Sequence, residues 1–179
     1  MMLRFALLFL FALSVPAETV VSGRVLKVLP LFLDLKGRTS VSPSLLERDA
    51  YQAQLRDKPA LRSGLEFAVK WRASGPPETQ LTLRLEMRGG RPGQLPTQTT
   101  LEQTLTPKGG LFGAWTSVPL IGKEYQRVGE VNSWRATLWH GTRLLAEDKS
   151  FLWHAALQPM PVGTTPPAGQ GSTPVAVRP

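Results

Sequence analysis

Two stretches of strictly alternating side chains constrain the fold of this chain more than any other feature. From Leu65 to Arg72, one parity carries Leu, Phe, Val and Trp, and the other carries Glu, Ala, Lys and Arg. Residues 79–88 repeat the pattern, with three leucines and a methionine on the apolar parity. Successive side chains of a strand point to opposite faces, so each stretch predicts a β-strand with one buried face. The turn-rich residues 74–78 make the two strands antiparallel neighbours, either as a hairpin or across a sandwich.

Five further segments predict strands. Val20 to Leu35 is long and apolar with Pro30 in its middle, which is typical of an edge strand that bends or switches sheets. The other four segments are residues 97–105, 111–121, 131–139 and 143–153. His140-Gly141, between the last two, resembles the sequence of a tight two-residue hairpin turn.

The register of this last hairpin has two solutions. Centring its turn on His140-Gly141 pairs Trp134 with Glu147, and Trp153 has the same parity as that glutamate. A buried glutamate opposite a tryptophan is unfavourable. We therefore expect either a bulge near residues 147–148 or a hairpin loop longer than two residues.

Two segments depart from the β pattern. Ser44 and Glu47 have the spacing of a capping box, which predicts a short helical insert over residues 44–56. The expected buried face of this helix comprises Leu46, Ala50 and Ala53, with Tyr51 and Leu55 on the adjoining flank. Residues 123–128 predict a second, single helical turn.

About seven strands, with helices only in connections, predict an all-β fold, a two-sheet antiparallel β-sandwich. Residues 20–153 thereby resemble the immunoglobulin or fibronectin type III architecture, with Trp71, Trp134 and Tyr125 as counterparts of its core Trp and corner Tyr. The Cys pair of antibody-type domains is missing. In residue choice the chain is also similar to small secreted bacterial proteins, a likeness that carries no catalytic or binding motif. A fold shared by so many functions assigns none of them.

The first residues have the order of an export signal. A basic start ends at Arg4, an apolar run covers residues 5–15, and compact residues occupy 15–17. The run is well below the ~20 residues of a membrane-spanning helix. We expect a signal peptide over residues 1–17, a folded domain over residues 18–154, and a soluble periplasmic or secreted product; the alternative is a retained amphipathic helix.

Residues 155–179 have a different composition from the rest of the chain. They carry six of the sixteen prolines and a single charge. Such a segment buries too little apolar surface to offset its ordering entropy, so we expect a disordered tail or linker. The alternative is a docking peptide in polyproline conformation.

The residue inventory argues against catalysis. The chain has no Cys and only two His, which leaves little for a metal site or an activated nucleophile. Neither His140 nor His154 has a nearby triad partner in the sequence. The sequence contains no GxSxG, P-loop, HExxH or EF-hand pattern. We expect no enzyme, no cofactor and no metal.

The net charge of +8 admits anionic partners such as acidic glycans or anionic lipid. The cations are scattered, with no run of five, which favours ordinary solubility as their role. Nothing resembles a recognition helix, so nucleic acid is not an expected partner.

The candidate binding residues are Trp139, Arg135 and Arg84. If Trp134 and Leu138 face the core, Trp139 and Arg135 face outward, as Arg84 does on its own strand. An exposed Trp beside Arg is typical of protein interfaces, whereas a Trp can also stack on a sugar or cap the end of the sandwich.

The sequence thus predicts a non-catalytic binding or structural module for a protein with an acidic patch. The alternative is a carbohydrate-binding module, and an enzyme of unknown type is third. If Trp139 is only structural, the loops around residues 88–91 are the next candidate site.

Overall fold

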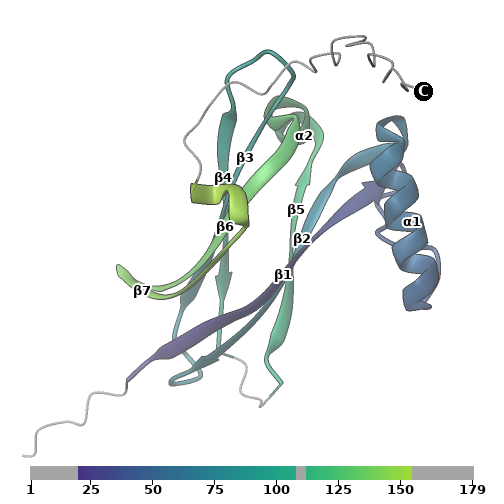
Figure 1. Ribbon diagram of the computed structural model, residues 1–179. Coiled ribbons are helices and arrows are strands. Elements are labelled where there is room, and N and C mark those ends of the chain that lie inside the picture. The colour runs from purple at the N-terminus through teal and green to yellow at the C-terminus, as the bar shows by residue number, and fades with distance from the viewer. Residues whose placement is uncertain (1–19, 108–111, 155–179) are drawn as a thin grey trace, which may run out of the picture.

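The computed structural model describes residues 20–107 and 112–154, and in these residues seven strands form two antiparallel sheets (Figure 1). The three-stranded sheet has the order β1-β2-β5, and the four-stranded sheet has the order β4-β3-β6-β7. The strands are β1 Ser22–Asp34, β2 Arg62–Ser74, β3 Leu81–Gly90, β4 Thr97–Leu105, β5 Ala114–Ile121, β6 Glu130–His140 and β7 Arg143–Lys149. The helices are α1 Leu45–Asp57 and α2 Gly122–Val128, with 3-10 turns η1 Pro59–Leu61 and η2 Phe151–His154.

These elements confirm the predicted all-β, two-sheet antiparallel architecture. The expected signal peptide, residues 1–17, and the expected tail, residues 155–179, lie outside the described residues. Within the described ranges, no helix is long and apolar enough to cross a membrane.

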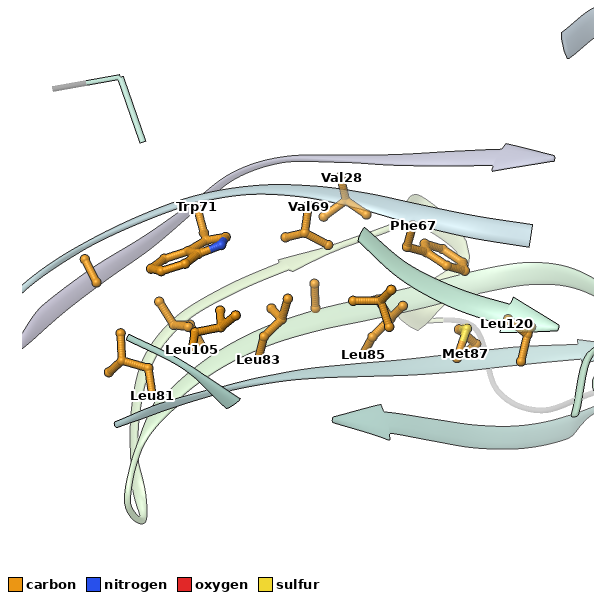
Figure 2. Packing of buried hydrophobic residues seen from close by; sticks show 14 of the residues in the cluster. Val28, Phe67, Val69, Trp71, Leu81, Leu83, Leu85, Met87, Leu105 and Leu120 are labelled. Carbon is orange, nitrogen blue, oxygen red and sulfur yellow. The ribbon is translucent and has the colours of Figure 1, made fainter. Parts of the chain in front are cut away.

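The core lies between β2 and β3, which belong to different sheets and face each other across the sandwich. The apolar parity of β2 packs against that of β3, as Figure 2 shows. Six residues predicted to be buried, Phe67, Val69, Trp71, Leu81, Leu83 and Leu85, are each at most 2% exposed. Trp71 donates its Nε1–H to Thr116 Oγ1 over 2.8 Å, so its one polar atom is satisfied.

Strand β1 forms an edge of the three-stranded sheet, as its proline predicts. Among the described strands it pairs with β2 alone, and it stays in one sheet. One irregularity lies at Leu26, where the register shifts between Val25 and Lys27, and a second lies between Leu33 and Asp34. The ladder runs without interruption through Pro30 between them. Helix α1 lies beside the C-terminal half of this edge strand (Figure 1).

Helix α1 has the expected position but not the expected face or cap. Leu46 is 81% exposed, Ala50 and Ala53 are exposed, and the buried residues are Gln52 and Leu55. The reason is that the helix meets the edge of β1 through hydrogen bonds more than through an apolar stripe. Ser44 occupies the N-cap position without a side-chain capping bond, so the predicted capping box is wrong.

The last hairpin differs from both expected solutions. His140 pairs with Arg143, so the two-residue turn is Gly141-Thr142, and Gly141 has the positive φ of +55° that such a turn needs. A bulge is present at Leu145 instead of residues 147–148. The strand ends at Lys149, so Trp153 does not share its parity.

Candidate functional site

The structure brings the three predicted site residues onto the outer face of the four-stranded sheet. Arg84 on β3 lies opposite Thr137 on β6, between the positions of Arg135 and Trp139. The Arg84 guanidinium lies 5.3 Å from the Trp139 ring centroid. Trp139 is half-buried and donates its Nε1–H to Thr137 Oγ1 over 2.8 Å. The expected grouping of cations around a tryptophan is therefore present.

The two predicted cations, Arg84 and Arg135, are already paired with carboxylates of this face. Arg84 Nε is 2.7 Å from Glu102 Oε1, and Arg135 Nη2 is 2.6 Å from Glu86 Oε2. Glu147 accepts a hydrogen bond from Lys149, and this bond, against the effect of desolvation, lowers the pKa of Glu147 from its ordinary value. An acidic partner would have to replace these pairs, which makes the face a weaker site than the sequence predicts.

Turn η2 also covers part of this face. Trp153 is 7% exposed, and the guanidinium carbons of Arg88 and Arg135 lie 3.9 and 5.2 Å from its ring centroid. Arg88 Nη1 further donates to the Trp153 carbonyl oxygen over 2.9 Å. Trp153 thus covers the surface around Arg88, which belongs to the second candidate site predicted from the sequence, residues 88–91. Strand alternation does not predict this contact, because Trp153 lies beyond the end of β7.

A cleft of about 220 Å³ opens between the two sheets, beside the C-terminal end of β1. It exists because β6 begins at Glu130, whereas its pairing with β7 begins only at Arg135. Ser150 extends that contact to Trp134, whose N–H and C=O it engages. On the far side of β6, Glu130, Val131 and Ser133 pair with β3, and Asn132 lies at a register shift of that ladder. Within the described residues, no strand pairs with 130–133 on the β7 side.

Three aromatic side chains from three elements line this cleft. Phe32 comes from β1, Tyr125 from α2 and Trp134 from β6, and each is half-buried against the core. Pro30, Leu65 and Val131 add apolar surface. Arg56, Glu130 and Asn132 add polar groups, and a concave surface that combines aromatic rings with a few polar groups is typical of binding sites. The sequence pointed to Trp134 and Tyr125 as core residues only, and Phe32 gave no signal of its own.

A buried arginine fixes one end of the cleft. The Arg62 guanidinium lies 3.9 Å from the Phe32 ring centroid and donates to both carboxylate oxygens of Glu130, over 3.2 and 3.0 Å. It also donates to the carbonyl oxygens of Leu55 and Arg56 at the end of α1. Because this cation connects β2, α1 and β6, it holds the walls of the cleft in place.

Within the described chain, the carboxylate whose pKa is shifted furthest, Asp34, has a structural role. Asp34 accepts hydrogen bonds from the main chain of Lys36 and Arg38, from the Arg38 guanidinium and from the Tyr51 hydroxyl. The Arg38 main-chain bond contributes most to holding the pKa of Asp34 below its usual range. The hydrogen bond from the Tyr51 hydroxyl to Asp34 raises the pKa of Tyr51. This network joins the loop after β1 to α1.

The titratable residues of the described ranges form no cluster suited to a metal. No group of three His, Asp or Glu is placed to hold an ion there. His140 and His154 are both exposed, one beside a hairpin turn and one at the end of η2.

No protein-family model, no curated protein and no solved structure matches the chain.

Proposed function

We propose that the chain is an exported, non-catalytic β-sandwich module of the immunoglobulin-like type that binds a protein partner. The Greek-key order, with β1-β2-β5 facing β4-β3-β6-β7, supports the immunoglobulin-like assignment. The order of basic, apolar and compact residues over 1–17 supports export.

The proposed binding site is the aromatic cleft. The observation that carries it is that β6 extends beyond β7 beside three half-buried aromatic rings. An extended segment of a partner can lie along residues 130–133, as peptides do when they add to a sheet edge. A proline or apolar side chain of that segment would then pack against Phe32, Tyr125 and Trp134, because aromatic residues are the usual anchors of protein interfaces.

Site-specific photo-crosslinking in the native host tests this proposal. A photoreactive phenylalanine analogue replaces Asn132, which is exposed at the cleft, or Glu102, which is exposed on the Arg84 face. We expect a discrete protein adduct from position 132 and none from 102, and loss of the adduct when Tyr125→Ser is added. An adduct from 102 alone would return the site to the Arg84 face. No protein adduct from either position would refute the protein partner.

A carbohydrate is the second candidate ligand, and a different tryptophan favours it. Trp115 on β5 is 52% exposed, whereas Trp139 is half-buried with its N–H engaged. An exposed indole ring is a surface on which a sugar ring can stack. This candidate uses the outer face of the three-stranded sheet, opposite the Arg84 face.

A further inference from the structure

Four cations lie together on the outer face of the three-stranded sheet. They are Arg24 and Lys27 on β1 and Lys70 and Arg72 on β2, and none forms an ion pair within the described part of the chain. The register places Arg24 opposite Arg72 and Lys27 opposite Lys70. We call these four residues, together with Trp115, the basic face.

The two sheets differ in which charges lie opposite each other on neighbouring strands. On the four-stranded sheet, Arg84 lies opposite Glu102 and Arg135 opposite Glu86. On the basic face, like charges oppose each other, an arrangement that destabilises a sheet. Glu66 lies further along β2 and accepts a hydrogen bond from Ser117 Oγ over 3.0 Å. A bound anion would relieve the repulsion that the basic face carries.

Trp115 connects the basic face to a groove with a different chemistry. It lies opposite Lys70, whose ammonium is 5.8 Å from the Trp115 ring centroid. A groove of about 390 Å³ runs beside it, between β4 and β5. The polar side chains that line the groove are Gln103, Thr104, Thr106, Thr116 and Ser117. Hydroxyl and amide groups are both donors and acceptors, which suits a ligand rich in hydroxyl groups.

We infer that the basic face and the adjoining groove bind an anionic polysaccharide of the uronic-acid type. A sugar ring stacks on Trp115, its hydroxyl groups meet the side chains of the groove, and carboxylates along the polymer meet the four cations. An acidic protein or an anionic membrane would satisfy the cations and Trp115. The hydroxyl and amide groups of the groove, of which those of Gln103, Thr104 and Thr106 are exposed, favour the sugar. This inference rests on the second candidate function and uses a surface separate from the aromatic cleft.

Binding of polygalacturonate, followed by calorimetry and tryptophan fluorescence, tests the inference. We expect wild-type protein to bind with an affinity that falls as salt rises, because exposed charges are screened. Lys27→Gln/Lys70→Gln and Trp115→Ala should each weaken binding about tenfold or more, the effect of removing a central contact. The double variant should melt no lower than wild type, since it removes a like-charge pair. The matched control, Arg84→Gln/Arg135→Gln, removes two cations from the other sheet and should bind as wild type does.

Three results would overturn the inference. Equal loss of binding in the control would mean that net charge, and not the basic face, binds the polymer. Equal affinity for fully methyl-esterified polygalacturonate would exclude the charge contacts while leaving a neutral carbohydrate as ligand. Binding to polyglutamate or to phosphatidylglycerol vesicles, without binding to polygalacturonate, would assign the face to a protein or a membrane. The crosslinking at Asn132 reports on the protein partner independently of all three.

Discussion

Replacing Gln52 by leucine tests how α1 is held against the sandwich. Gln52 is 7% exposed and makes three hydrogen bonds to main-chain groups. Its Oε1 accepts from Phe32 N over 2.8 Å, and its Nε2 donates to Phe32 O over 2.9 Å and to Thr39 O over 2.7 Å. Because Phe32 lies on the edge of the sheet, this side chain takes the place of a neighbouring strand.

The expected loss follows from those three bonds. Each contributes about 1 kcal/mol, and a buried main-chain group left without a partner costs about 1–3 kcal/mol. Leucine has a similar volume and returns part of this through apolar burial. We expect Gln52→Leu to lower the free energy of unfolding by about 3 kcal/mol.

Urea unfolding measures that loss, and Gln54→Leu is the matched control. Gln54 lies on the exposed side of the same helix, so its replacement should change stability by at most about 0.5 kcal/mol. Hydrogen exchange adds a local readout, because the Phe32 amide should lose protection only in Gln52→Leu. Equal losses in the two variants, or a Phe32 amide that stays protected, would refute this role for Gln52.

Three further predictions concern the core, pH and the last turn. Trp71→Ala should cost about 3–5 kcal/mol in denaturant melts, whereas Arg84→Ala should cost at most about 0.5 kcal/mol; similar costs would mean that the two faces are misassigned. Since the pKa of Asp34 is lower in the folded than in the unfolded state, its stabilisation is present above about pH 4 and is lost as the pH falls. Asp34→Asn should therefore be less stable at pH 7 and lose less stability on acidification, and a melting series from pH 7 to 3 decides this. A chain ending at His154 should keep its melting temperature, while one ending at Ser150 should melt lower because it lacks the buried Trp153; identical melting of the two would show that Trp153 contributes nothing.

The strands were predictable because alternation is a local property. The inward direction of Leu83 and Trp71 follows from the polar residues on either side of each of them. The partner of each strand is a property of the whole chain, so the sequence left open whether β2 and β3 form a hairpin or face each other across the sandwich. The face of α1 was mispredicted because Gln52, its principal contact, is polar and binds main chain.

One of the four cations of the basic face, Lys27, was hidden by an irregularity of β1. By simple alternation, Lys27 shares the parity of the inward Val25 and not that of Arg24. The register shift at Leu26 moves Lys27 to the outer surface, opposite Lys70. A bulge of this kind leaves no clear mark in the sequence, because it depends on how two strands meet. The predicted trio Arg84, Arg135 and Trp139 was placed correctly, but its pairing with glutamates from neighbouring strands required the register.

Strand β2 has a consequence for the rate at which the chain folds. It is the central strand of its sheet, and its partner on one side, β5, lies far along the chain, with Phe67 opposite Val118. Contacts between such distant residues require the closure of long loops, and all-β proteins of this kind fold in milliseconds to seconds. Until β5 arrives, the main chain of β2 and its buried side chains stay open to pairing with other chains. The docking of β5 completes the three-stranded sheet and removes the free edge of β2, which ends this exposure to aggregation.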